Sequence, residues 1–525
     1  MLRSRPQAGF FITFNLFPML VHPQVAQEEY RRLNGHQPLD VRYARPDAPE
    51  SFNAVDAALG KIIGNAHKKV LVVLNVGETP LGPGLDKGVP GIGAYDLRHG
   101  AVFDKRAVFV VDKQYFEGSE ASNNHLEALG MHAQSGKPNL YPVDMNGMLH
   151  FQALVHGLKH PGDNDVKRLP WSDIGAIQSF YWSPAADELT QLLRAQGWTG
   201  ENVLHPQERS RAVLALNNKV EMMRAFKKRG ADMHDFGFGY SEAELVKAFE
   251  DLSEKEGSNK LYMKLGQAVS GLGNQCVRSV EELKTKLAEL PEGYLEEHGA
   301  LIEPEFEIFF SPGVVFHVDE NGEVTILSVS DQITEGATHL GNVDPSLVFD
   351  KQYEYLLPQL YKGTLAYAQE AISRGVSNIT MGLDFLAVKG ADGRLKLIPS
   401  DPNGRHTGSS HMHAVRRKIL NGHSNESLNG LLTDNNVKVE VGTTPNDLAE
   451  LYESQSWHLP GFRDGEQNCS VTTLNAAPAM HASEADESKV QVAMMRRFDR
   501  KTPVATVQAA MRALRAEVHP ILKHL

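Results

Sequence analysis

The sequence GLDFLAVKGADGRLKLIPSDPNGRHTG, residues 382–408, decides how the rest of the chain is interpreted. Its middle, residues 389–394, is a turn signal between two runs of alternating apolar residues, which predicts a β-hairpin. Asp384 lies where the chain enters this hairpin and Asp401 where it leaves. We therefore expect the hairpin to hold the two carboxylates side by side.

The strand that leaves the hairpin carries further polar residues at every second position. Asp401, Asn403 and Arg405 share one face of an extended chain because its side chains alternate. Two carboxylates and an amide oxygen suit Mg²⁺, which leaves room for substrate phosphates, and Arg405 offers a positive fork to a phosphoryl oxygen. Taken alone, the same pattern also fits solvated acids at the base of a hairpin. The motifs upstream are needed to distinguish a metal site from this alternative.

Length and composition limit the classes of protein. The chain has 525 residues, 41% of them hydrophobic and 22% charged, which predicts several domains and an ordinary soluble protein. The net charge of −12 argues against a nucleic-acid partner and against an acidic membrane surface. Cys276 and Cys469 cannot form a disulfide framework, so we expect a cytoplasmic protein.

The apolar run at residues 10–21 follows Arg3 and Arg5 and superficially resembles the core of a signal peptide. Asn15 and Pro18 interrupt the run, and it is too short to cross a bilayer. We expect it to form a buried strand.

The first part of the chain has the pattern of doubly wound α/β structure. Residues 70–76 and 107–112 are continuously apolar, as strands covered on both faces must be. The loop between them contains only the Gly-Ile-Gly of residues 91–93, without the rest of a dinucleotide-binding fingerprint. A nicotinamide-dependent dehydrogenase is therefore a poor alternative.

Two lysines in the middle of the chain have the setting of phosphate-binding groups. Lys219 lies in the first turn of a helix predicted at residues 218–230. Lys264 ends a strand predicted at residues 261–265 and is followed by a loop rich in glycine and serine. Such a loop can turn its N–H groups toward an anion, although it is also an ordinary flexible turn, and it is not a Walker A loop. The loop residues of interest are Ser270, Gly271 and Gly273.

The segments that follow are predicted to be β-structure. Residues 300–311 form a strand interrupted at Pro304, where backbone groups left out of the ladder could bind an adenine edge. Residues 314–329 form a hairpin, and Asp331 and Gln332 are expected to end its second strand beside the site.

These ordered motifs resemble the ATP-grasp superfamily, most nearly carboxylate-amine ligases with a pre-ATP-grasp domain of the pheganomycin peptide ligase type. The resemblance covers about residues 205–480 and rests on three segments, residues 264–274, 311–332 and 382–405. Residues 407–411 also resemble the small-residue and histidine run of that group. Three departures are visible: Asp401 stands where the group has Glu, Leu272 where it has an acid, and Phe309 and Phe310 replace a basic pair.

The resemblance implies an α/β protein with an α+β ATP-grasp domain. A doubly wound pre-ATP-grasp domain would come first, then a two-lobed ATP-grasp domain, then a small C-terminal helical extension that completes the fold. In that extension we expect helices at residues 444–452 and 504–525 and an exposed linker at residues 476–488. The implied ranges are 1–205, 206–425 (lid lobe about 230–300, metal-binding lobe about 301–425) and 426–525.

The resemblance also implies an activity, that of an ATP-dependent ligase. Such an enzyme activates a carboxylate as an acyl phosphate, lets an amine displace phosphate, and releases ADP. Lys264 and Arg405 would act in catalysis, and Asp384, Asp401 and Asn403 would hold Mg²⁺ or Mn²⁺. The implied ATP-binding residues are Lys219, Lys264, Ser270, Gly271, Gly273, Glu303, and Glu305 or Glu307 at the ribose.

Other outcomes stay open at this point. An ATP-grasp enzyme can phosphorylate or carboxylate its acceptor instead, and a non-catalytic ATP-binding regulatory protein is also compatible with Asp401. The expected partners are a small-molecule carboxylate and amine, with a homodimer possible. His411 and His413 lack a third metal ligand nearby, which favours substrate contact or an exposed position.

Overall fold

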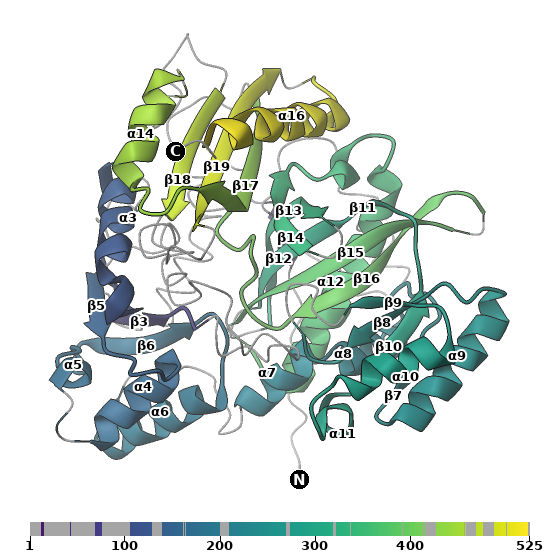
Figure 1. The fold of residues 1–525 in the computed structure, drawn as a ribbon, viewed down its shortest axis with the longest axis horizontal. Coiled ribbons are helices and arrows are strands. Elements are labelled where there is room, and N and C mark those ends of the chain that lie inside the picture. The colour runs from purple at the N-terminus through teal and green to yellow at the C-terminus, as the bar shows by residue number, and fades with distance from the viewer. Residues whose placement is uncertain are drawn as a thin grey trace.

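The computed structural model describes three sheets, which Figure 1 shows in separate parts of the molecule; we call each sheet with the helices packed on it a layer. The residues it describes are 12–14, 42–43, 69–75, 105–128, 139–160, 162, 164–199, 209–268, 274–318, 322–335, 338–377, 379–390, 392–412, 415, 427–455, 457, 469–475, 488–499 and 501–522. The predicted domain boundaries near residues 205 and 425 fall outside these ranges and stay predictions. So do the Gly-Ile-Gly loop at 91–93 and nearly all of the linker at 476–488.

The first sheet is parallel throughout and confirms the doubly wound α/β prediction. Its strand order is β5-β4-β3-β6, so the direction of winding reverses between β3 and β6. β3 and β4 are almost wholly buried, as their apolar sequences require, whereas β5 at the edge is only partly buried. Helices follow β4, β5 and β6. The elements are β3 (Lys69–Val73), β4 (Ala107–Asp112), α3 (Phe116–Ala128), β5 (Asn139–Val143), α4 (His150–Lys159), α5 (Asn164–Lys167), β6 (Ile174–Ser179) and α6 (Pro184–Ala195).

The carboxyl ends of β3 and β6 meet at the point where the winding reverses. Asn75 accepts a hydrogen bond from Tyr181 N at 3.1 Å and donates one to Tyr181 O at 2.8 Å. His406 N in turn donates to Phe180 O, so the segment after the predicted metal strand rests on this end of the first sheet. Reversal points of this kind are common ligand crevices in doubly wound sheets.

The second sheet is small and antiparallel, with strand order β7-β10-β8-β9. Two helices pack on it, and each begins at a serine whose side chain accepts an N–H of the first turn. Together they bury a separate apolar core. The elements are β7 (Gly237–Gly239), α9 (Glu242–Glu256), β8 (Leu261–Leu265), β9 (Gln275–Val277), α10 (Val280–Ala288), α11 (Tyr294–His298) and β10 (Ala300–Pro304).

The third sheet has eleven strands and contains the predicted hairpin. The predicted strand at residues 300–311 is split at Pro304, because β10 belongs to the small sheet and β11 to the large one. The predicted hairpin at residues 314–329 is present as β12 paired with β13, but β13 runs on to Glu335. Its elements up to the hairpin are β1 (Ile12–Phe14), β2 (Arg42–Tyr43), β11 (Ile308–Phe310), β12 (Pro312–Val318), β13 (Val324–Glu335), β14 (Thr338–Asp344), β15 (Ile379–Lys389) and β16 (Leu395–Asn403).

Three helices pack near the hairpin strands. Helix α12 begins at Leu357, directly after short 3₁₀ turns. Helix α8 confirms the predicted helix at residues 218–230. Their bounds are α7 (Arg209–Asn217), α8 (Lys219–Lys228) and α12 (Leu357–Ser373).

The C-terminal part continues the large sheet through β17, β19 and β18. Both predicted helices are present here, and they bury one apolar core together with these strands. The strands themselves were not predicted, because β17 is rich in asparagine, glycine and aspartate, which disfavour strands until a neighbouring strand pairs with them. The elements are β17 (Ser427–Val439), α14 (Pro445–Ser454), β18 (Cys469–Asn475), β19 (Ser488–Asp499) and α16 (Val504–Leu522).

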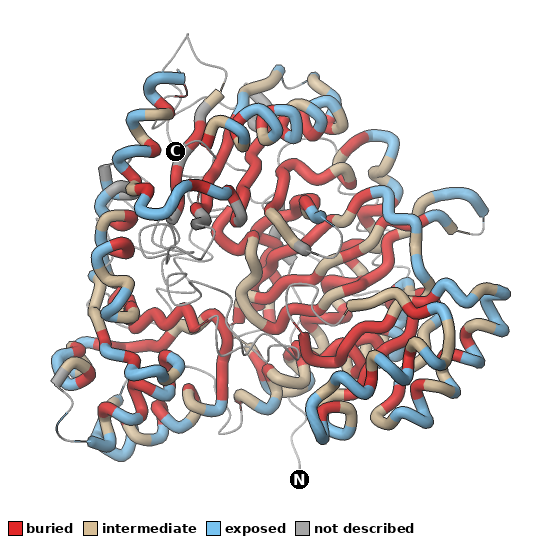
Figure 2. Tube along the Cα trace, in the orientation of Figure 1, coloured by how far each residue is buried: buried red, intermediate tan, exposed pale blue. Residues whose placement is uncertain are grey.

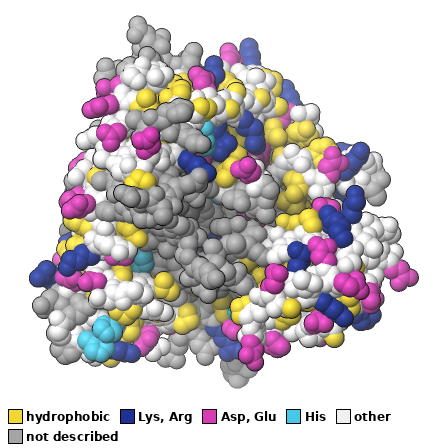
Figure 3. Space-filling view, viewed as in Figure 1, with side chains coloured by type: hydrophobic (Ala, Val, Ile, Leu, Met, Phe, Trp, Pro, Cys, Tyr) yellow, Lys and Arg dark blue, Asp and Glu magenta, His cyan; other side chains and the backbone are white. Residues whose placement is uncertain are grey.

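Burial follows these layers. Figure 2 shows the strands of the large sheet buried along most of their length, while the helices alternate between buried and exposed turns. On the face in Figure 3, lysine and arginine side chains are interspersed with aspartate and glutamate. Within the described ranges, no helix is both long and apolar enough to cross a membrane.

Gln508 joins the C-terminal helix to the central strands, and we expect its loss to destabilise the protein. Its Nε2 donates to Asp331 Oδ2 at 3.1 Å and to Pro345 O at 2.6 Å. Gln508→Leu leaves these buried acceptors without that donor, so urea unfolding should show a loss on the order of 1–3 kcal/mol. Ala513→Leu, which adds the same side chain at an exposed position of α16, should change stability little. Equal effects of both substitutions would contradict the assigned role.

Candidate active site

The hairpin places its two aspartates opposite each other, as the sequence predicts. Asp384 on β15 is the direct partner of Asp401 on β16. Asn403, two residues further along, donates its amide N–H toward Asp384 Oδ2 at 3.4 Å and to Asp401 O at 3.2 Å. Two carboxylates and an amide therefore converge on one spot of the large sheet.

The electrostatics of this pair follow from its crowding. Burial and the neighbouring carboxylate of Asp401 raise the pKa of Asp384 to about 7, although a hydrogen bond from Gln332 acts in the opposite direction. Gly313, the partner of Asp384 on β12, has no side chain in the way, and an added Cβ would lie 2.8 Å from Asp384 Oδ1. The site is thus shaped to hold two carboxyl groups whose full ionisation requires a nearby cation.

Lys219 supplies one such positive charge. It is the first residue of α8, where the Asn218 side chain caps the helix by accepting from Glu221 N. Its Nζ lies 2.9 Å from Asp401 Oδ1 and donates to Ala268 O, also at 2.9 Å. Gly404 lets the end of α7, which directly precedes Lys219, lie close to the segment after β16, because a Cβ at Gly404 would lie 2.7 Å from Leu216 Cβ.

Lys264 lies on the small sheet and reaches the metal strand through Ser400. Its Nζ contacts Ser400 Oγ at 2.9 Å and Glu303 Oε1 at 2.5 Å. His234 Nε2 approaches the other oxygen of Glu303 at 3.1 Å. These contacts bring the second predicted lysine to the residue next to Asp401, from a different layer of the molecule.

The carboxylate of Glu303 is fully buried but strongly paired. Burial acts to raise its pKa, but the charge of Lys264 and the hydrogen bonds from His234 and Lys264 outweigh burial and lower the pKa to about 2. The carboxyl group is therefore ionised at neutral pH.

This lowered pKa predicts an acid-dependent loss of stability. A carboxyl whose pKa is lower in the folded than in the unfolded chain stabilises the fold above its unfolded value of about 4.5, and the stabilisation is lost as pH falls toward about 2. The full contribution is about 3 kcal/mol. Urea unfolding through a pH series should show a shallower acid decline in Glu303→Gln than in the unmodified protein, and parallel declines would refute the pairing.

Arg405 lies beside the carboxylate pair and above an aromatic ring of the first sheet. Its guanidinium carbon is 5.7 Å from the centroid of Phe180, and Nη1 donates to His406 O at 3.3 Å. Burial lowers the pKa of Arg405, while Asp401, Tyr367 and Asp384 act to raise it. The arginine thus brings a positive charge to the same site as Lys219.

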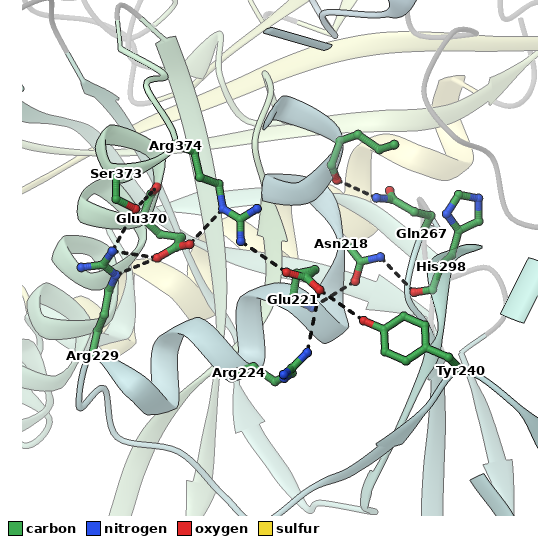
Figure 4. Close-up of polar contacts among 11 residues, drawn as sticks. Asn218, Glu221, Arg224, Arg229, Tyr240, Gln267, His298, Glu370, Ser373 and Arg374 are labelled. Atoms are coloured by element: carbon green, nitrogen blue, oxygen red, sulfur yellow. Dashed lines mark hydrogen bonds and ion pairs between the residues drawn. The ribbon is translucent and has the colours of Figure 1, made fainter. Parts of the chain in front are cut away.

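A network of ion pairs and hydrogen bonds holds α8 in place (Figure 4). Glu221 accepts from Arg374 at the end of α12 at 3.3 Å and from the Tyr240 hydroxyl at 3.2 Å. Asn218 Nδ2 donates to His298 O at 2.9 Å, and Arg229 pairs with Glu370. Tyr240 and His298 belong to the small sheet with its helices, and Arg374 follows α12, which packs on the large sheet. The helix that carries Lys219 is therefore fixed to both of these layers.

Several predicted residues are not brought into this cluster. Glu305 is exposed and pairs with Arg278 at 2.9 Å, and Glu307 is also exposed, between β10 and β11. Ser270, Gly271 and Gly273 lie outside the described residues. The roles of these five residues stay predictions.

Two other expectations differ from the structure. Asp331 does not end its strand but is fully buried, accepting hydrogen bonds from Ser346 and Leu347 N, and burial raises its pKa to about 6. His411 is fully buried rather than exposed, with Nε2 lying 3.1 Å from Gln491 Nε2 of β19, while His413 is not described. Gln332, in contrast, does face Asp384.

The sequence analysis missed His234 and Ser400, which complete the surroundings of Lys264. Ser400 directly precedes Asp401, so its place in the hairpin could have suggested it. A single histidine at 234 carries no such signal, because only the packing of the chain brings it against Glu303.

The donor set fits Mg²⁺ better than a metal bound by protein alone. Among the described residues there is no cluster of three or more histidine, cysteine, aspartate or glutamate side chains able to hold a metal. Mg²⁺ typically takes one or two carboxylates and completes its shell with water and substrate phosphates. Asp384 and Asp401 match that requirement, and Asn403 can present its oxygen after a half-turn of its amide.

The three layers, with two lysines meeting a carboxylate-bearing hairpin, define the ATP-grasp fold. Among solved structures, the chain is similar to N5-carboxyaminoimidazole ribonucleotide synthetase in its ADP complex, with a TM-score of 0.50 and 12% identity, over 86% of this chain and 97% of that one. It is also similar to the biotin carboxylase domain of Hydrogenobacter thermophilus 2-oxoglutarate carboxylase, with a TM-score of 0.48 and 14% identity, over 86% of this chain and 90% of that one.

At this level of identity the first likeness establishes the fold alone. No protein-family model matches the chain, and no curated protein matches its sequence. The pheganomycin peptide ligase type within the superfamily therefore stays a prediction, and the reaction has to be argued from the site.

Proposed function

We propose that this protein is an ATP-dependent carboxylate-amine ligase, which forms an amide through an acyl phosphate and releases ADP and phosphate. The observation that carries the proposal is that Lys219 and Arg405 face the Asp384–Asp401 pair while Lys264 reaches Ser400, the residue before Asp401. Three positive groups and two carboxylates, supplied by separate layers, suit the transfer of a phosphoryl group between two anions. The similar fold of an enzyme solved with ADP supports the nucleotide.

The three positive groups would have different roles in the reaction. Lys219 and Lys264 would hold the phosphates of ATP through N–H groups that their present carboxylate contacts leave available. Arg405 would stabilise the negative charge that develops on the activated carboxylate and on the oxyanion of amine attack. Because each is held by buried contacts, little reorganisation is needed when the substrates arrive.

Asp384, Asp401 and Asn403 would hold the divalent cation, Mg²⁺ or Mn²⁺. When bound, the cation neutralises phosphate charge during transfer. Burial and the carboxylate of Asp401 raise the pKa of Asp384, and a cation between the two carboxylates would offset their repulsion.

The remaining nucleotide contacts follow the sequence predictions. Glu303 to Phe306 would line the adenine, with Glu305 or Glu307 at the ribose, and the loop with Ser270, Gly271 and Gly273 would cover the phosphates.

The proposal is tested by incubating the purified protein with ATP, Mg²⁺ and pooled amino acids and small carboxylates while phosphate release is followed. A ligase requires two added components and yields a product whose mass is their sum less water. The activity should vanish in Asp401→Ala. A phosphorylated product from one component would indicate a kinase, and ADP binding without release by any pool would favour a regulatory protein.

Carboxylation is the second candidate, because the similar structure is a synthetase whose name describes a carboxyamino product. Adding bicarbonate with a pool of amines separates the two reactions. Phosphate release that requires bicarbonate, and not a second organic acid, would replace the ligase by a carboxylase.

A further inference from the structure

A row of polar residues crosses one face of the large sheet, starting at the carboxylate pair. Asp384 pairs with Gly313 on β12, and Gly313 pairs with Ser330 on β13. Side chains of directly paired residues point to the same side of a sheet. Gln332, two residues after Ser330, is therefore on this face too, in agreement with its hydrogen bond to Asp384.

The row continues onto the C-terminal strands. Gln332 pairs with Asn342 on β14, and Asn342 pairs with Thr433 on β17. Asn342 Nδ2 also donates to Ser330 Oγ at 3.2 Å. The register therefore leads from the carboxylates to Thr433 on β17 without leaving one face. Asn435 lies in a register shift of β17, and its hydrogen bond with Gln491 places it on the same face.

The opposite face of these strands is already occupied. Asp434, between Thr433 and Asn435, contacts His519 of α16 at 2.8 Å. The face that carries Thr433 and Asn435 is therefore turned away from the C-terminal helix.

Three buried side chains at this end of the row have polar atoms without a partner. Thr433, Asn435 and Gln491 of β19 are at most 5% exposed. Gln491 Nε2 donates to Asn435 Oδ1 at 2.8 Å, which joins the two amides. Within the described part of the chain, Thr433 Oγ1, Asn435 Nδ2 and Gln491 Oε1 have no hydrogen-bond partner.

Unpaired polar atoms of this kind are costly and need an explanation. A buried group that lacks a hydrogen bond loses its hydration without compensation. Here one free donor, one free acceptor and a hydroxyl that can act as either lie together on adjacent strands, and none carries a fixed charge. Their complement is an uncharged group that offers both a carbonyl and an N–H.

We propose that Thr433, Asn435 and Gln491 form a substrate-binding site for an uncharged amide, at the far end of the polar row from Asp384 and Asp401. The site deepens the proposed ligase function and rests on it, since it would hold a remote part of the carboxylate or amine substrate. The amide is either a side-chain carboxamide or a backbone amide.

The test compares substrates of matched shape in the phosphate-release assay. Glutamine and asparagine supply a carboxamide, pooled dipeptides supply a backbone amide, and glutamate and aspartate supply anions. We expect an amide pool to support release better than the matched anions. Preference for the anions overturns the proposal.

Substitutions at Thr433 and Gln491 test whether these residues bind the amide. Thr433→Val and Gln491→Leu should each raise KM for the active amide substrate about tenfold, the value of one lost hydrogen bond, and leave KM for ATP within about twofold. The control is Thr473→Val on β18, which removes a hydroxyl bonded to Tyr452 at 2.9 Å and should leave both KM values unchanged. An unchanged amide KM in both site variants overturns the proposal.

Thermal unfolding checks that the variants fold. Thr433→Val removes an unpaired hydroxyl and should keep or raise Tm, whereas Thr473→Val should lower it. If no pool releases phosphate, the ligase proposal fails by itself, and saturation-transfer NMR with N-acetylglycinamide tests the site directly. Binding that Thr433→Val abolishes and Thr473→Val retains supports the site, and absence of binding overturns it.

Discussion

Asp401→Asn should lower ATP-dependent phosphate release about 100-fold or more while the protein stays folded. The substitution keeps the shape of the side chain but removes the charge that faces both Lys219 and Asp384. The cation would then be held by one carboxylate, and Lys219 would lose the partner that positions its ammonium group. Measurements of the initial rate of phosphate release at saturating ATP test this expectation.

Asp392→Asn is the matched control, because Asp392 lies in the turn of the same hairpin and is exposed. It accepts a local hydrogen bond from Arg394 N, so the activity of the Asp392→Asn variant should remain within about twofold of that of the unmodified protein. Comparable losses in both variants would mean that the hairpin, and not the carboxylate pair, limits the reaction. Full activity of Asp401→Asn would remove Asp401 from the metal site.

Lys264→Met should destabilise the protein by about 3–5 kcal/mol, because it leaves the carboxylate of Glu303 buried without its main counter-charge. The side chains of Lys264 and Glu303 are only 7% and 3% exposed, and His234 alone would remain beside the carboxylate. Urea unfolding measures the loss. Lys247→Met, at an exposed position of α9, should change stability little.

A second substitution separates the structural role of Lys264 from its proposed role with ATP. Glu303→Gln in the Lys264→Met background removes the stranded charge and should restore much of the lost stability. It should not restore ADP binding, measured by calorimetry, because the phosphate-binding ammonium group is still missing. Recovery of both properties would show that Lys264 only balances Glu303.

The sequence predicted the elements whose signals are local. The turn at residues 389–394 between alternating strands set Asp384 against Asp401, and the side-chain alternation of β16 carried Asn403 to the same spot. Apolar runs predicted the buried parallel strands β3 and β4, and the first turn of α8 predicted where Lys219 would lie. In each case the residues that decide the geometry are near one another in the chain.

What only the tertiary structure decided involves residues far apart in the sequence. Pairing of Lys264 with Glu303, burial of His411 and Asp331, and continuation of the large sheet through β17, β19 and β18 all depend on which layers pack together. The polar row from Asp384 to Thr433 exists only through the register of five strands, β15, β12, β13, β14 and β17. Periodicity along a chain specifies which side of a strand each residue occupies, but the pairing partner is chosen by burial and hydrogen bonding between distant segments.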